Sequence, residues 1–161
     1  MNKNQKTKDK ICSFYTSDYH FEMISLPYIS KKIEENKEVI ILTENNLENT
    51  INKLVSNINL NNDKKEKILN LNWKDDDFKK FKIINKNIDN KKNMVIFIKG
   101  NENYIKNINK NIEKWIDKNY DTQVIDCYNL EEISEKIDEI TTNYTEVLST
   151  NGKKNWRKLN K

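Results

Sequence analysis

The sequence predicts an α/β protein, with a three-layer arrangement in which a mostly parallel sheet of about five to six strands carries helices on both faces. Short apolar runs dominated by isoleucine recur along the 161-residue chain. Several of them are continuous rather than alternating, which is typical of strands buried on both faces. Amphipathic helical patterns lie between the runs, and this alternation implies right-handed crossovers. The length suits one domain.

Six segments have the composition of strands. "KICSFY" opens the series, and "EVIILT", "NMVIFI" and "QVIDCY" are its most apolar members. Runs of this length, bounded by polar residues, are typical of strands in a parallel sheet. The six expected strands are residues 10–15, 38–43, 67–73, 93–98, 123–128 and 145–149.

Helices are expected over residues 18–36, 44–58, 76–90, 101–119 and 130–142. In four of them apolar residues repeat at spacings of three and four, although the pattern of 76–90 is weaker. The first segment is apolar nearly all round from Phe21 to Ile29, so we expect it to be central, with a kink at Pro27. Asp18, Thr43 and Asn129 are the expected caps.

Composition excludes several classes of protein. The net charge of +4 is mild, and 25 acidic residues are interspersed with 29 basic ones, so no dense basic stripe favours nucleic acid. One histidine and two distant cysteines cannot supply a conventional zinc site, and we expect reduced, buried thiols at Cys12 and Cys127. No apolar run reaches the length of a membrane span. We therefore expect a cytoplasmic protein with no metal, no cofactor and no membrane partner.

The ends of the predicted strands define a candidate binding site. In an open parallel sheet, ligands bind outside the carboxyl ends of the strands. The polar and aromatic residues that follow these ends are candidate ligand-binding residues: Tyr15, Ser17, Asp18, His20, Glu44, Trp73, Lys99, Tyr128 and Asn129.

Nucleotide chemistry of the usual kind is excluded at this site. Phosphate loops need two or three closely spaced glycines, because the backbone must approach the phosphates without an intervening Cβ. This chain contains only Gly100 and Gly152. A helix N-terminus can still attract an anion, but a conventional nucleoside triphosphatase or dinucleotide enzyme is not expected.

Catalysis at the first strand–helix junction is a weaker hypothesis. Ser17, Asp18 and His20 include the residue types of a triad, but three residues in one turn rarely reach the required geometry. The favoured alternative is that Asp18 caps the helix while Ser17 and His20 satisfy backbone groups. Glu44 could act as an acid or base, although a first-turn glutamate favoured by the helix dipole is the preferred interpretation. No catalytic residue is assigned, and a hydrolase or transferase centred on Asp18, His20 and Glu44 stays an alternative.

Other candidates also have two interpretations. Trp73 and Tyr128 could stack on a planar ligand or cover the end of the sheet, and Lys99 could pair with an anion or lie in solvent. Residues 151–161 form a basic C-terminal tail, which could bind nucleic acid or end the chain as a frayed segment. Its candidate nucleic-acid contacts are Lys153, Lys154, Arg157 and Lys158.

In residues 11–56, Tyr15 ends the first expected strand, "SLPYI" lies in the following helix, and "VIILTE" forms the second strand. This segment resembles the opening of the MEDS family, sensory domains of regulators in methanogens and methylotrophs. "VIDCYNL" resembles the later strand that closes with Cys127 and Tyr128. The chain departs from the family near Tyr144, where the family's histidine is absent, and at 33–38, where its glycines are missing. Residues 60–120 match only in the order of elements.

This resemblance implies a RecA-like fold that has lost its phosphate loop and a sensing role in place of catalysis. Residues 1–9 would form an N-terminal arm and residues 10–150 a single MEDS-like domain. The expected partner is a small molecule or a regulatory protein, bound at the carboxyl-end rim. No kinase or DNA-binding output module fits beside the domain in 161 residues, so a homo-oligomer or a partner would transmit the signal. A nucleic-acid-associated regulator that uses the basic tail is the alternative.

Overall fold

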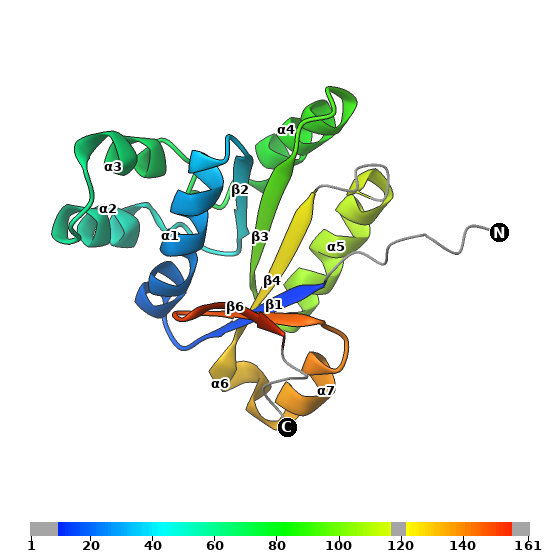
Figure 1. Cartoon of the computed structure of the whole chain (residues 1–161). Helices are drawn as coiled ribbons and strands as arrows, with labels where there is room; N and C mark the ends of the chain where they lie inside the picture. The colour runs from blue at the N-terminus through cyan, green and yellow to red at the C-terminus, as the bar shows by residue number, and fades with distance from the viewer. Residues whose placement is uncertain (1–9, 117–121, 156–161) are drawn as a thin grey trace.

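A computed structural model describes residues 10–116 and 122–155 and confirms the predicted α/β class. Its sheet has six strands in the order β2-β3-β4-β1-β5-β6. Strands β1 to β5 are parallel, and β6 pairs antiparallel with β5 at one edge (Figure 1). The strands are β1 (Ile11–Tyr15), β2 (Glu38–Thr43), β3 (Met94–Gly100), β4 (Gln123–Asn129), β5 (Glu146–Ser149) and β6 (Gly152–Asn155).

The helices form two layers on opposite faces of the sheet (Figure 1). Three helices between β1 and β3 cover one face: α1 (Asp18–Glu34), α2 (Glu48–Asn57) and α3 (Asn62–Leu69). The other face is covered by α4 (Asp77–Asp89), α5 (Glu102–Ile116), α6 (Leu130–Ile133), a 3₁₀ turn (Ser134–Lys136) and α7 (Ile137–Thr141). None of the helices in the described part of the chain combines the length and the apolar character that crossing a bilayer requires.

Alternating strand side chains build two separate cores. In β3, Val95 and Phe97 pack beneath α1, whereas Ile96 and Ile98 pack beneath α5. All seven residues of β3 are buried, which explains why its sequence is a continuous apolar run. Removing such side chains from water on both faces is the main stabilising contribution to a sheet of this kind. Ile11, buried in β1, extends the first core toward β5.

The strand predicted over residues 67–73 is wrong. This stretch contains the end of α3 and a loop, so three helices connect β2 to β3 in place of the two helices and intervening strand that the sequence predicts. Asn61 caps α3 by accepting a hydrogen bond from the Lys64 amide at 2.8 Å, and Asp63 pairs with Lys67 one turn later. These local interactions favour a helix. The apolar side chains of the run contribute to the core instead, where Ile68 is buried.

Strand β6 was not predicted, because the basic sequence of residues 151–161 is typical of a C-terminal tail. Gly152 has a φ of +97°, a conformation that glycine adopts without a steric cost. It turns the chain back so that Lys153 pairs with Leu148 and Lys154 with Val147.

Candidate functional site

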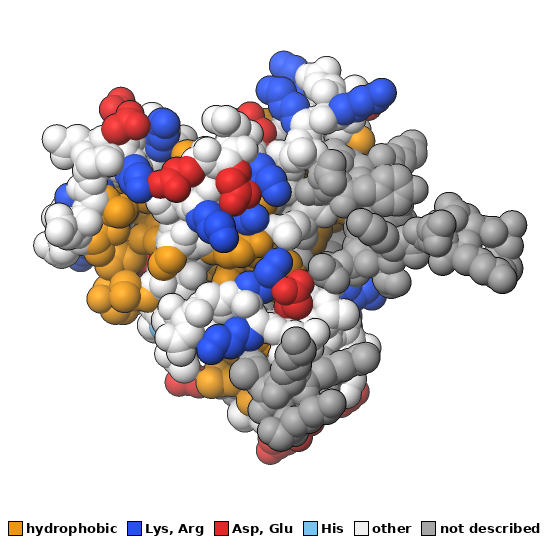
Figure 2. Space-filling view, in the orientation of Figure 1, with side chains coloured by type: hydrophobic (Ala, Val, Ile, Leu, Met, Phe, Trp, Pro, Cys, Tyr) orange, Lys and Arg blue, Asp and Glu red, His pale blue; other side chains and the backbone are white. Residues whose placement is uncertain are grey.

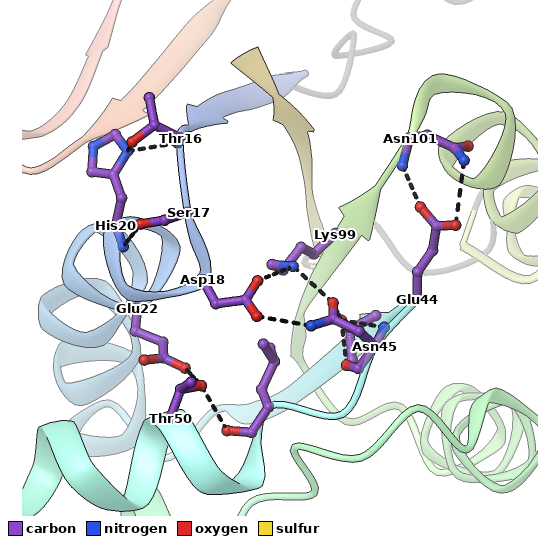
Figure 3. Close-up of polar contacts among 12 residues, drawn as sticks. Thr16, Ser17, Asp18, His20, Glu22, Glu44, Asn45, Thr50, Lys99 and Asn101 are labelled. Carbon is purple, nitrogen blue, oxygen red and sulfur yellow. Dashed lines mark hydrogen bonds and ion pairs between the residues drawn. The ribbon is translucent and has the colours of Figure 1, made fainter. Parts of the chain in front are cut away.

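The β1–α1 junction is held by its own side chains (Figure 3). Ser17, in an extended conformation, is the N-cap of α1, and its hydroxyl accepts a hydrogen bond from the His20 amide at 3.0 Å. The His20 ring accepts at Nδ1 from the Thr16 amide at 2.9 Å. The prediction that Asp18 caps this helix is wrong, because Ser17 takes that position. Ser17 and His20 do satisfy backbone groups, as predicted. The Ser17 hydroxyl and the His20 ring are not arranged as a nucleophile and its base.

Asp18 instead forms the centre of a three-residue polar network, which we call the rim network: Asp18, Asn45 and Lys99 (Figure 3). The Lys99 ammonium lies 2.8 Å from Asp18 Oδ1 and donates to Asn45 Oδ1 at 2.9 Å. The Asn45 amide nitrogen completes the triangle by donating to Asp18 Oδ2 at 2.9 Å. The chain segments that follow β1 and β2 are thereby tied to the end of β3.

Lys99 is one of three buried lysines among the described residues, together with Lys32 and Lys80. It is 3% exposed, whereas the Asp18 side chain is 35% exposed. The ammonium also lies 4.6 Å from the centroid of the Tyr15 ring and 5.6 Å from that of Phe21, which adds cation–π attraction. A buried lysine requires this degree of compensation. The alternative that Lys99 lies in solvent is wrong, and its anionic partner is Asp18 of the same chain.

Glu44 lies beside the rim network but serves a different helix (Figure 3). Its carboxylate accepts from the backbone amide and the side-chain amide of Asn101, just before α5. The interpretation of Glu44 as a first-turn residue of the helix after β2 is wrong, since α2 begins at Glu48 with Leu47 as its N-cap. A Cβ on Gly100 would lie 2.4 Å from Glu44 Oε1, so this close approach requires a glycine at position 100.

Thr43 does not cap a helix either. It is the last residue of β2, and its hydroxyl donates to the Asn45 carbonyl at 2.9 Å. This contact shapes the short loop that carries Asn45 toward Asp18. The predicted cap at Thr43 is therefore wrong, but the residue positions one member of the rim network.

Two of the other predicted rim residues belong to the interior. Trp73 follows no strand; it is 2% exposed, and its indole nitrogen donates to the Ile68 carbonyl at 2.8 Å. Tyr128 is buried on the opposite face, where its hydroxyl lies 2.6 Å from that of Tyr144. Neither side chain offers an exposed surface for stacking on a ligand. Asn129 caps α6, as predicted, by accepting from the Glu131 amide at 3.0 Å.

Glu22 was not singled out from the sequence. It lies on α1 with no exposed surface; Thr50 of α2 donates to its Oε2, and its Oε1 has no hydrogen-bond partner. Burial, partly opposed by the Thr50 hydrogen bond, raises the pKa of Glu22 to about 7. A strongly shifted carboxyl beside a charged network is a frequent mark of a functional region. The available signal was a glutamate inside a helix that is apolar nearly all round.

A second polar cluster, also missed from the sequence, lies on the other face around Asp126 of β4. The Tyr144 hydroxyl donates to Asp126 Oδ2 at 2.6 Å, and the Asn109 amide of α5 donates to Oδ1 at 3.1 Å. Burial raises the pKa of the Asp126 carboxyl. An aspartate inside the run "QVIDCY" was the signal for this cluster.

The remaining predicted residues have structural roles or fall outside the structure. Lys153 pairs with Glu146 at 3.5 Å across β5 and β6, and Lys154 is exposed on β6. Arg157 and Lys158 lie outside the described residues. Cys12 and Cys127 are free and buried, as predicted, and burial raises the pKa of the Cys12 thiol to about 12.

An apolar groove lies between α1 and the loop that joins α2 to α3, where hydrophobic side chains gather at the left of Figure 2. Met23, Leu26 and Pro27 form one wall, and Ile58 and Leu60 form the other, around a cavity of about 300 Å³.

No cluster of three or more histidine, cysteine, aspartate or glutamate residues that could bind a metal occurs within residues 10–116 and 122–155.

Comparisons with known proteins add no family to this description. No protein-family model, no curated protein and no solved structure matches the chain. The site must therefore be interpreted from its own contacts.

Proposed function

We propose that this protein is a non-enzymatic regulatory domain that binds a small molecule or a protein partner at the carboxyl-end rim of its sheet. The rim network of Asp18, Asn45 and Lys99 is the observation that carries this proposal. The network lies where β1 passes into α1. Beside it are the neighbouring strands β2 and β3, which are followed by helices on opposite faces of the sheet, α2 and α5. Ligands of open α/β sheets bind at such a switch point. The resemblance to MEDS sensory domains supports the same function.

The charge of the rim network argues against a nucleotide as the ligand. The N-terminus of α1 could attract a phosphate, but Asp18 places a carboxylate in its first turn. The one buried cation beside it, Lys99, is already paired with that carboxylate at 2.8 Å. A polyphosphate would have to displace Asp18 from Lys99 and would gain no glycine-rich backbone in return. A neutral or cationic group that bonds to the exposed part of Asp18 fits better.

The connections of the network suggest how binding would be transmitted. Asp18 begins α1, Asn45 precedes α2, and Lys99 lies one residue before the end of β3. A ligand that draws Asp18 away from Lys99 would weaken the contacts that hold these three segments together. A ligand shifts a conformational equilibrium only by its differential affinity for the two states, and competition for Asp18 provides such a difference. In this proposal the domain acts in the cytoplasm, without a cofactor, through a partner or through a second copy of itself.

Native mass spectrometry of the freshly purified chain, compared with its denatured mass, tests the proposal. We expect extra mass, or a multiple of the 19.3 kDa chain, under native conditions only. Asp18→Asn should lose the additional species, because it removes the charge of the rim network. Asp89→Asn, an exposed carboxylate at the far end of α4, is the matched control and should retain it.

Two results would count against the proposal. A bare monomer in all three proteins would contradict the small-molecule and homo-oligomer forms. An additional species that survives Asp18→Asn would place binding away from the rim. Binding to DNA that weakens steeply with salt and is lost on deletion of residues 151–161 would favour the nucleic-acid alternative instead.

A further inference from the structure

The largest of the cavities that we describe lies away from the rim, at the amino end of the sheet. It has a volume of about 380 Å³ and lies between the starts of β1 and β4, the second half of α5 and the segment before β5. Ligand sites begin at roughly 300 Å³, so the cavity has room for a small molecule. Its polar walls come from Asn109, Asp126 and Tyr144, and its apolar walls include Ile11 and Ile116.

Asp126 is the residue that gives this cavity its chemistry. The residue is 8% exposed, and its two carboxylate oxygens accept one hydrogen bond each, from Tyr144 at 2.6 Å and from Asn109 at 3.1 Å. A carboxylate offers about four lone-pair positions, so acceptor capacity is left over. Within the described part of the chain no cation lies within 4 Å of Asp126.

A buried carboxylate without a cationic partner is energetically unfavourable. The donors that contact Asp126 are neutral, and Lys10, whose charge favours the ionised form of Asp126, is exposed. A second carboxylate, Glu113, lines the same cavity. Among the described lining residues there are two carboxylates and one lysine, Lys10, so the lining has more acceptor and negative character than that lysine offsets.

A buried hydroxyl without a hydrogen-bond partner lines the same cavity. Thr122, the residue before β4, is 4% exposed and lines the cavity. Its hydroxyl is buried and has no hydrogen-bond partner. Buried hydroxyls are nearly always hydrogen-bonded in native proteins, so this group marks a second point where a polar ligand or its hydration could be bound.

We propose that the cavity binds a small protonated amine, with the ammonium group against Asp126 and an aliphatic body against Ile11 and Ile116. The ammonium supplies the cation that Asp126 lacks and uses its remaining lone pairs. Tyr144 lines the cavity, and its ring centroid lies 6.2 Å from that of Tyr128. Because Tyr128 bonds to Tyr144 and Tyr144 bonds to Asp126, an occupant of the cavity is linked to the end of β4. This site is independent of the rim proposed above.

The test uses n-butylamine hydrochloride as the probe and 1-butanol as the uncharged control of equal chain length. Two-dimensional amide NMR of the full chain should show saturable shift changes for the amine, centred on Asn109, Asp126 and Tyr144, and none of that pattern for the alcohol. Asp126→Asn should weaken amine binding at least about tenfold, since a hydrogen bond to a charged group is lost. Glu139→Gln, which removes an exposed carboxylate on α7, should leave the affinity unchanged.

The outcomes separate this site from the rim. Asp18→Asn should bind the amine as the wild type does, whatever its effect on the species retained in native mass spectra. Equal binding of butanol, equal affinity in Asp126→Asn, shift changes centred elsewhere or no saturable change with the amine would each overturn the proposal. If Asp126→Asn does not fold, the shift map of the wild-type chain decides the question on its own.

Discussion

Two aspartates at opposite ends of the sheet differ in how the surrounding residues compensate their charge. Asp18, at the carboxyl end, has a buried lysine 2.8 Å away and an asparagine bridging both partners. Asp126, at the amino end, is more deeply buried, and among the described residues its hydrogen-bond donors are the neutral groups of Tyr144 and Asn109. Within residues 10–116 and 122–155, the first charge has a cation beside it and the second does not.

This difference in charge compensation determines what the rim network and the amino-end cavity can each do. A compensated pair fixes local geometry, because removing either partner leaves the other without its counter-charge. The rim network thus stabilises three chain segments and can respond to whatever competes for Asp18. An uncompensated carboxyl either binds a proton or waits for a cation, and burial does raise the pKa of Asp126. The amino-end cavity is therefore suited to capture a cation.

The largest effect that we predict comes from removing the rim cation. Lys99→Met should lower the free energy of unfolding by about 3–4 kcal/mol, since the pair is broken and the bonds to Asp18 and Asn45 are lost; the partial exposure of Asp18 limits the loss. Urea denaturation at pH 7 measures it. Lys53→Met, at an exposed position on α2, is the matched control and should change stability by less than about 0.5 kcal/mol. Equal stability of both variants would show that the network does not stabilise the rim.

An intermediate effect, with a defined pH dependence, is predicted for Glu22, which lies behind the rim network. Its pKa is about 7 in the folded chain against an ordinary value of 4.5, so the folded state holds the proton more tightly than the unfolded state does. Wild-type stability should therefore fall as the pH rises from about 4.5 through 7 and level off above that range, by about 3 kcal/mol in total.

Glu22→Gln should remove this dependence, because the amide does not titrate. The measurement is the difference in unfolding free energy between variant and wild type, taken at pH 5 and at pH 8. We expect the variant to gain on the wild type between these two values. A difference that is the same at both pH values would mean that Glu22 is ionised throughout and that its charge is compensated in another way.

Much of the fold could be predicted because it depends on patterns that are local in sequence. Strands β1 to β4 have buried side chains on both faces and therefore contain continuous apolar runs, and α5 (Glu102–Ile116) repeats its isoleucines with helical period. The error at 67–73 arose because a short apolar run does not separate a strand from a buried helix end. The cap and the ion pair of α3 favour the helix, and they depend on Asn61 and Asp63, which precede the run. Strand β6 depends on pairing with β5 and carries no apolar signal.

The site could be predicted only as far as one edge of the sheet. The rule that strand ends meet at one edge brought Tyr15, Asp18 and Lys99 together correctly. It failed for Trp73, because no strand precedes that residue, and for Tyr128, because the sequence does not say which face a strand side chain takes. Glu22 and Asp126 were visible as acidic residues in apolar runs. Their partners, Thr50 and Tyr144, come from distant parts of the chain, and only the tertiary structure brings them into contact.

The smallest predicted effect tests the uncompensated end of the comparison. Tyr144→Phe removes the hydroxyl that donates to Asp126 and that lies 2.6 Å from the Tyr128 hydroxyl. It should lower the free energy of unfolding by about 1–2 kcal/mol, the range for losing a buried hydrogen bond, while Asn109 still donates to Asp126. Tyr19→Phe, at a side chain that is 59% exposed, should have no measurable effect. A loss for Tyr144→Phe as large as that for Lys99→Met would mean that neutral hydrogen bonds stabilise the amino end as strongly as the ion pair stabilises the rim, and the contrast between the two aspartates would then fail.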